Sequence, residues 1–220
     1  MQSIKKWNKM HSYLMLAGLF IIVTTNELWL FLSISSLSFL VYILVHWSFL
    51  TTFRPFAGYA NWITAFRLIL ILTGAFGLIF WPAAYCFPFF LIGLALDGID
   101  GHLARKHKHN SDFGAYFDME TDSFYVAILA SFWWLTSIAG VWILFVGFLR
   151  YIYVFLLKIF KLEGKKEKST RFAKTIAVVI MVALLTPFAL PSFLYTPILV
   201  IASILTVYSF GVSFISKLSN

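Results

Sequence analysis

The sequence predicts an all-α protein, a polytopic membrane bundle of about eight transmembrane helices. Of its 220 residues, 61% are hydrophobic, 20% are aromatic and only 12% are charged. This composition, with a mean hydropathy of +0.88, is typical of an integral membrane protein. A chain of 220 residues is also too short for a membrane domain plus a second large domain.

Long apolar runs predict the individual helices, since a helix needs about 20 residues to cross a bilayer. They lie near residues 11–25, 28–50, 61–82, 86–106, 113–137, 140–160, 171–187 and 192–215. Residues 1–10 are interpreted as an amphipathic cytoplasmic lead-in. Lysines followed by an apolar run also begin a signal peptide, but residues 24–27 (T-T-N-E) offer no small-residue cleavage site. We therefore expect the first span to be retained.

The distribution of basic residues predicts the orientation. All 17 Lys and Arg residues lie in, or lead toward, the connections on one side of the predicted bundle. The opposite connections, near residues 25–27, 82–88, 136–140 and 187–191, contain none. By the positive-inside rule we expect the basic side and both termini to be cytoplasmic. The membrane itself is expected to be a bacterial inner membrane. Membrane topology thus accounts for the net charge of +8, and no nucleic-acid partner is expected.

The most informative segment, residues 97–122, places four of the nine acidic residues of the chain at helical spacing. Its pattern is D-x-x-D-G-x-x-A-R-x8-G-x-x-x-D-x-x-x-D, with fixed positions at Asp97, Asp100, Gly101, Ala104, Arg105, Gly114, Asp118 and Asp122. A carboxylate at membrane depth is costly unless it is paired, hydrated or bound to a metal. The segment is therefore expected to be the working part of the protein.

Helical spacing explains how these carboxylates can meet. Asp97 and Asp100 are three residues apart, whereas Gly114, Asp118 and Asp122 step by four along the next predicted helix. Two such helices, facing each other across a short hairpin, would bring all four carboxylates together. Oxygen ligands of this kind suit Mg²⁺, Mn²⁺ or Ca²⁺ rather than zinc or iron.

The other fixed positions favour a phosphate-containing ligand. Arg105 offers a planar fork that matches a phosphate group. Gly101, Ala104 and Gly114 lack bulk and leave room for a ligand against the backbone. Together with a metal, these features predict a nucleotide diphosphate site. A solvated acidic hairpin or a Ca²⁺ loop would leave the arginine and the small residues unexplained.

The segment from Asp97 to Asp122 resembles the signature of the CDP-alcohol phosphatidyltransferase family, at all eight fixed positions. The resemblance implies a six-helix core over residues 58–220, preceded at 1–57 by the lead-in and two extra helices. It also implies a homodimer that moves a phosphatidyl group from a CDP-linked lipid, CDP-diacylglycerol, to an alcohol and releases CMP.

The resemblance further implies roles for single residues. Two Mg²⁺ or Mn²⁺ ions would be held by Asp97, Asp100, Asp118 and Asp122, and Asp122 would also act as general base. The CDP group would contact Gly101, Ala104, Arg105 and Gly114. Residues 61–67 (N-W-I-T-A-F-R) are similar to the start of the family's first helix, which adds Asn61 and Thr64 to the CDP contacts. The alternative is a helix cap at Asn61 and an interfacial anchor at Arg67.

The acceptor alcohol stays open between two classes. Arg150 lies inside the sixth predicted helix, and Arg171 and Lys174 begin the seventh in a stretch that resembles phosphatidylglycerophosphate synthases without two of its fixed residues. If these cations reach the metal site, they favour a phosphorylated acceptor such as glycerol 3-phosphate, which is our expectation. If they serve only topology or snorkelling, serine, inositol or choline fits better.

Two other classes of protein fit these residues less well than an enzyme. A cation transporter could use the aspartates as an ion path, but it does not require Arg105 and the small residues. A catalytically inactive scaffold is disfavoured because all four aspartates are present. No Ser/His/Asp or Cys/His arrangement supports transfer through a covalent intermediate.

Overall fold

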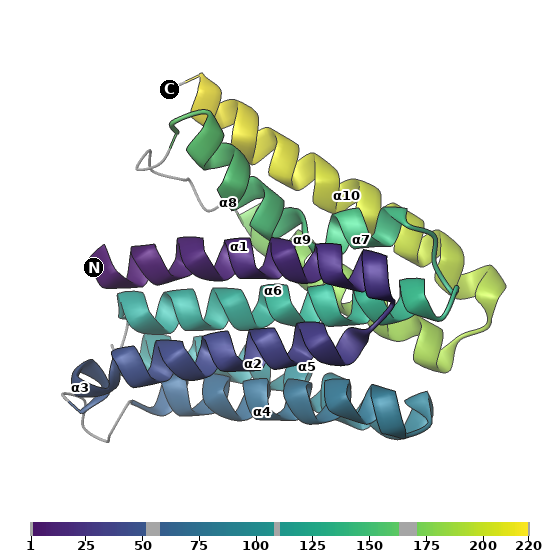
Figure 1. Ribbon diagram of the computed structural model, residues 1–220, viewed down its shortest axis with the longest axis horizontal. Coiled ribbons are helices and arrows are strands. Elements are labelled where there is room, and N and C mark those ends of the chain that lie inside the picture. Colours follow the sequence, from purple (N-terminus) through teal and green to yellow (C-terminus); the bar gives the residue numbers. More distant parts are fainter. Residues whose placement is uncertain (1, 52–57, 108–110, 163–170, 220) are drawn as a thin grey trace. The chain divides into compact units, whose positions relative to one another are not determined.

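The computed structural model describes residues 2–51, 58–107, 111–162 and 171–219, and this part of the chain is helical throughout, apart from short turns. The helices are α1 (Gln2–Thr25), α2 (Leu28–Val45), α3 (Trp47–Leu50), α4 (Tyr59–Phe80), α5 (Ala83–His107), α6 (Asp112–Leu135), α7 (Trp142–Gly147), α8 (Leu149–Ile159), α9 (Arg171–Ala189) and α10 (Ser192–Leu218) (Figure 1). The chain forms two compact units, residues 1–125 and 126–220, and α6 crosses the boundary between them.

The eight predicted helices correspond in position to these elements, with three differences. Helix α1 begins at Gln2, so the predicted lead-in is part of the helix. The second predicted helix is interrupted at His46 and the sixth at Phe148, where the backbone leaves helical geometry. Gly147 directly precedes the second break, and glycine has a low helix propensity.

Among the described residues, four helical segments are long and apolar enough to cross a membrane: Leu28–Val45, Tyr59–Phe80, Phe172–Ala189 and Ser192–Leu218. This result confirms an all-helical chain with the apolar helices of an integral membrane protein. Helix α6, with 24 residues, is long enough to cross a membrane, but it carries four acidic residues in its first half. The apolar part of α5, Ala83–Asp97, is shorter than these four segments. A count of eight spans stays a prediction.

In the first unit, α1 packs along α2, α2 contacts α4, and α5 runs along α4 (Figure 1). The long helices α1, α2, α4, α5 and α6 reverse direction at each step along the chain, so α1 and α6 run the same way. Stacked aromatic rings join the N-terminal helices to α6. The Tyr42 ring lies parallel to that of Phe113 with centroids 4.6 Å apart, and Trp7 stacks on Tyr42 at 3.9 Å. The Tyr42 hydroxyl also donates to the carbonyl of Phe113 at 3.0 Å. Helices α1 and α2 are therefore firmly packed against α6.

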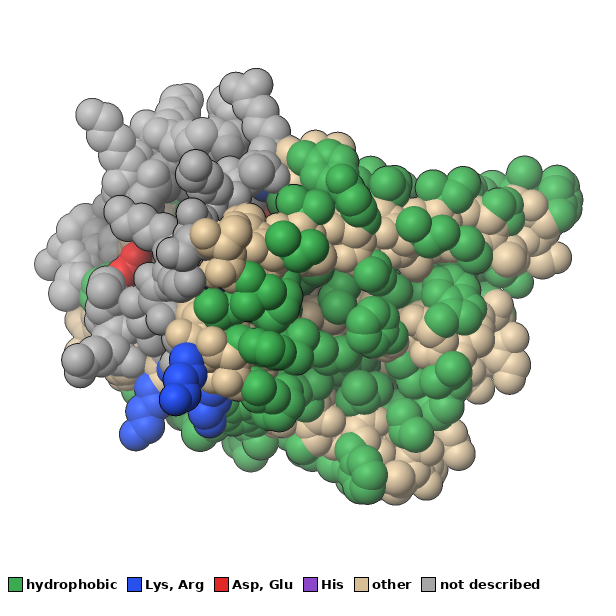
Figure 2. Space-filling view, turned by 90° about the horizontal axis from the view of Figure 1, so that it is seen from above, with side chains coloured by type: hydrophobic (Ala, Val, Ile, Leu, Met, Phe, Trp, Pro, Cys, Tyr) green, Lys and Arg blue, Asp and Glu red, His purple; other side chains and the backbone are tan. Residues whose placement is uncertain are grey.

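In the second unit, α10 packs along α9 and also contacts α7 and α8. The Trp133 indole N–H donates to the Leu184 carbonyl at 2.8 Å, which ties the end of α6 to α9. A Cβ on Gly147 would lie 2.5 Å from the Ala130 Cβ, so only glycine fits between α7 and α6. Hydrophobic side chains cover much of the face seen in Figure 2, as expected for helices in contact with lipid.

Candidate metal and nucleotide site

Helices α5 and α6 carry the aspartates of the motif. Asp97 lies on α5, and Asp118 and Asp122 are one turn apart on α6. One carboxylate oxygen from each of the three lies within 4.8 Å of the others, and all three residues are partly exposed. The structure thus brings these three predicted ligands together. Asp100, Gly101, Ala104 and Arg105 are also on α5, but their side chains lie outside the described part of the chain.

The start of α6 is fixed by a helix cap. The Ser111 hydroxyl accepts a hydrogen bond from the Gly114 backbone N–H at 3.0 Å. Serine is a preferred N-cap because its oxygen satisfies an N–H that has no partner within the helix. From this start, Asp118 and Asp122 fall on one face of α6, since residues four apart lie one above the other.

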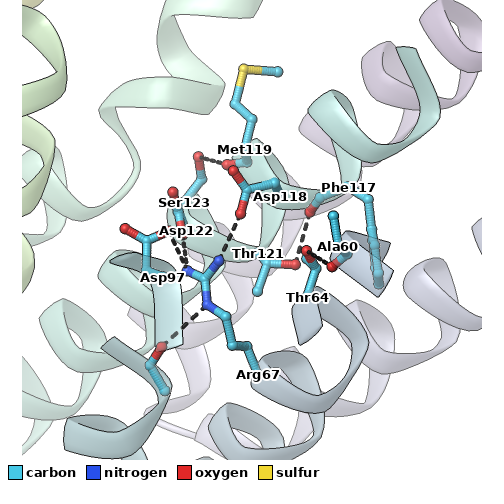
Figure 3. Close-up of polar contacts among 11 residues, drawn as sticks. Ala60, Thr64, Arg67, Asp97, Phe117, Asp118, Met119, Thr121, Asp122 and Ser123 are labelled. Atoms are coloured by element: carbon cyan, nitrogen blue, oxygen red, sulfur yellow. Dashed lines mark hydrogen bonds and ion pairs between the residues drawn. The ribbon is translucent and has the colours of Figure 1, made fainter. Parts of the chain in front are cut away.

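Arg67 on α4 lies at the centre of the aspartate cluster, and its side chain is fully buried (Figure 3). Its Nη1 donates to Asp118 Oδ1 at 2.7 Å. Its Nη2 lies 2.5 Å from Asp122 Oδ1 and 3.0 Å from Asp97 Oδ1. The interpretation of Arg67 as an interfacial anchor is therefore wrong, because a buried guanidinium needs charged partners and finds three of them here.

The guanidinium also fixes the geometry between helices. The Arg67 Nε donates to the Gly93 carbonyl on α5 at 3.2 Å. One side chain from α4 therefore bonds to both helices that carry the aspartates. Because a planar guanidinium presents its donors in a rigid fork, it restricts the rotamers of the carboxylates it binds.

The donor set fits a hard divalent cation. Three carboxylates against one guanidinium leave excess negative charge at the cluster. Arg67 contacts Oδ1 of all three carboxylates, and a carboxylate offers two oxygens with several acceptor sites for further ligands. Mg²⁺ and Mn²⁺ prefer ligands of this type. The aspartate cluster can therefore bind a divalent metal.

Asn61 and Thr64 lie on the same buried face of α4 as Arg67. The Asn61 side chain approaches α6 at Gly114, where an added Cβ would lie 2.5 Å from Asn61 Oδ1. The absence of a side chain at Gly114 therefore lets α4 approach the first turn of α6. The Thr64 hydroxyl donates to the Ala60 carbonyl of its own helix at 3.1 Å, and Figure 3 shows it beside Thr121 of α6.

The three cations predicted to bind the acceptor belong to the second unit. Arg150 on α8 is partly buried, and Lys174 on α9 is exposed. Arg171 begins α9, and its side chain lies outside the described part of the chain. Their role toward the acceptor stays a prediction.

Sequence reasoning missed the central place of Arg67 and gave no role to Glu120, which lies buried between Asp118 and Asp122 along α6. A signal existed in both cases. An arginine inside an apolar helix needs an acidic partner, and a glutamate between two motif aspartates must face away from them.

The described part of the chain thus combines the apolar helices of a membrane protein with three carboxylates that could together hold a metal ion. The sequence profile of the CDP-alcohol phosphatidyltransferase family matches residues 57–209. The chain therefore belongs to this family. The matched region begins just before α4, so α1, α2 and α3 precede it.

Individual relatives are similar to part of the chain. The CDP-diacylglycerol–glycerol-3-phosphate 3-phosphatidyltransferase of Yersinia enterocolitica is 37% identical over 86 residues, which cover 34% of this chain and 47% of the relative. The protein of the same name from Sodalis glossinidius is 34% identical over a region of the same length and coverage. The similarity thus spans about half the length of these relatives.

Proposed function

We propose that the protein transfers a phosphatidyl group from CDP-diacylglycerol to glycerol 3-phosphate and releases CMP. The observation that carries this proposal is the cluster of Asp97, Asp118 and Asp122 around Arg67 in a member of this family. The choice of acceptor rests on the names of the relatives from Yersinia enterocolitica and Sodalis glossinidius.

Asp97, Asp100, Asp118 and Asp122 would together hold two Mg²⁺ or Mn²⁺ ions. When bound, these cations would neutralise the diphosphate and stabilise the charge on the departing CMP. Asp122 would take the proton from the acceptor hydroxyl as its oxygen attacks the lipid-linked phosphorus and the bond to CMP breaks. Arg67 would keep Asp118 and Asp122 in place for this step.

The CDP group would lie against the small residues beside the carboxylates. Gly101, Ala104 and Gly114 leave space for the nucleotide, and Arg105 would bind its phosphates. Asn61 and Thr64 would contact it from α4. The aspartates would face the cytoplasm of a bacterial inner membrane, where basic residues gather and where CDP-activated substrates are found. Two copies would form a homodimer, as the family resemblance implies.

A CMP-release assay with a panel of acceptors tests the proposal. Purified protein with CDP-diacylglycerol and Mg²⁺ should release CMP with glycerol 3-phosphate and much less with serine, inositol or choline. If CMP is released only with an unphosphorylated alcohol, phosphatidyl transfer is supported but glycerol 3-phosphate is not the acceptor. Cation transport without CMP release would overturn the enzyme class.

Gly114→Ala should raise the KM for the CDP-lipid severalfold. The new methyl group would push the Asn61 amide out of its present position, because the two would lie 2.5 Å apart. Alanine has a better helix propensity than glycine, so stability should change little. Gly211→Ala is the matched control, since nothing lies within 4 Å of the added Cβ there. Equal KM values for the two variants would argue against a role of Asn61 in binding.

Arg150→Ala should raise the KM for glycerol 3-phosphate about tenfold or more, because a lost charge-assisted hydrogen bond costs about 1.5–3 kcal/mol. Lys174→Ala should act in the same direction but less. The KM for the CDP-lipid should stay the same in both variants. Lys158→Ala removes an exposed cation from the same helix as Arg150 and serves as the control. An unchanged acceptor KM in Arg150→Ala would make this arginine structural.

A further inference from the structure

Glu120 is a fully buried acid on α6 that has no part in the proposed reaction. It lies two residues from both Asp118 and Asp122, and two residues correspond to a rotation of about 200° around a helix. Its side chain therefore points to the face of α6 opposite the aspartates. Arg67 contacts the face of α6 that carries Asp118 and Asp122, and Glu120 lies on the opposite face.

Helix α1 supplies the partners of Glu120. The Asn8 side-chain amide donates a hydrogen bond to Glu120 Oε1. The other carboxylate oxygen, Oε2, lies 3.9 Å from His11 Nε2. Asn8 and His11 are themselves buried and lie almost one turn apart on α1. A buried carboxylate with two polar neighbours on one helix forms a specific attachment between α1 and α6.

Helix α2 completes this network. The His11 Nδ1 lies 2.7 Å from the Ser38 hydroxyl, and the Trp7 indole N–H donates to the Ser38 carbonyl at 3.2 Å. These contacts with α2 restrict the rotation of α1 about its axis, and so fix the positions of Asn8 and His11 beside Glu120. The stacked rings of Trp7, Tyr42 and Phe113 restrain the same helices closer to the start of α6.

We propose that Asn8, His11 and Glu120 are positioning residues, through which α1 sets the rotation of α6 and hence the geometry of the metal ligands Asp118 and Asp122. This inference rests on the proposed function for the metal-binding role of those aspartates. It assigns a catalytic purpose to α1, which lies outside the region matched by the family profile. A small rotation of α6 would shift both carboxylates together, and a displacement of about 1 Å can cost roughly 100-fold in rate.

The test measures Mn²⁺ binding to purified protein in detergent, by the electron paramagnetic resonance signal of free Mn²⁺. Asn8→Ala and Glu120→Leu should weaken binding by roughly ten- to hundredfold, the usual effect of losing a group that orients metal ligands. Asn8→Ala removes no charge, so its effect cannot come from altered electrostatic attraction. Glu120→Gln can still accept the hydrogen bond from Asn8 and should bind Mn²⁺ within about twofold of the wild type.

Ile22→Ala is the control for general destabilisation. Ile22 is fully buried on α1 but lies eleven residues beyond His11, about 16 Å along the helix. The variant should lower the melting temperature and leave Mn²⁺ binding unchanged. If Asn8→Ala binds Mn²⁺ like the wild type, or if Ile22→Ala weakens binding as much, the positioning role is overturned.

The same samples separate this inference from the proposed function. CMP release by the wild type tests the reaction, whereas the comparison of Mn²⁺ binding among variants tests the positioning. A wild type that binds Mn²⁺ but releases no CMP would overturn the proposed function, and the variant series would still decide the role of α1. If the wild type binds no Mn²⁺, Asp118 and Asp122 are not metal ligands, and the inference that Asn8, His11 and Glu120 position them is wrong.

Discussion

Asp122→Asn is expected to abolish phosphatidyl transfer, lowering the rate of CMP release by roughly 10²–10⁴-fold, the usual contribution of a general base. The amide cannot accept the proton of the acceptor hydroxyl, although Asp97 and Asp118 would still be available to a metal. Binding of the CDP-lipid should therefore stay measurable. The comparison requires both the rate of CMP release and the Kd for the CDP-lipid.

Asp112→Asn is the matched control for this prediction. It makes the same chemical change on the same helix, at an exposed residue of the first turn. Its rate should be close to that of the wild type. A near-normal rate in Asp122→Asn would remove the general-base role from this residue without excluding its role as a metal ligand.

Arg67→Met should destabilise the metal-free protein by up to about 3 kcal/mol, the lower end of the range for a broken buried ion pair, because it leaves three partly exposed carboxylates without their cation. For a chain of this size each kcal/mol lowers the melting temperature by roughly 2–4 °C. The loss should be smaller in Mg²⁺ than in EDTA, since a bound cation neutralises the same carboxylates. Thermal melting in detergent under both conditions measures the effect.

Leu68→Ala shows what a metal-independent destabilisation looks like. Leu68 follows Arg67 on α4 and is also buried, but it carries no charge. Its replacement should lower the melting temperature equally in EDTA and in Mg²⁺. If Arg67→Met shows the same loss under both conditions, the guanidinium does not share its carboxylates with a metal.

Much of the fold follows from local sequence patterns. Apolar runs place the helices, and the spacing of Asp118 and Asp122 puts both carboxylates on one face of α6. The breaks at His46 and Phe148 were not predicted, because neither has a proline to mark it. Helical periodicity does not report tertiary placement, so it does not decide whether Arg150 faces an acceptor.

The missed parts of the site are contacts between distant residues. Arg67 meets Asp122 across 55 positions of the sequence, and Asn8 meets Glu120 across 112. A local reading treats an arginine near a helix end as an interfacial anchor and an acid within a polar motif as solvated. The partners of Arg67 and Glu120 are brought to them only when the helices pack, and a buried charge then requires such a partner.

The central claim is that the aspartate cluster performs metal-dependent phosphatidyl transfer. The most direct test follows CMP release from CDP-diacylglycerol and glycerol 3-phosphate by purified protein in Mg²⁺, then in EDTA, then after Mg²⁺ or Mn²⁺ is restored. We expect release in Mg²⁺, loss of release in EDTA and recovery with either cation, because the clustered ligands are carboxylates. Full turnover in metal-free buffer, or no release in Mg²⁺, would contradict the claim.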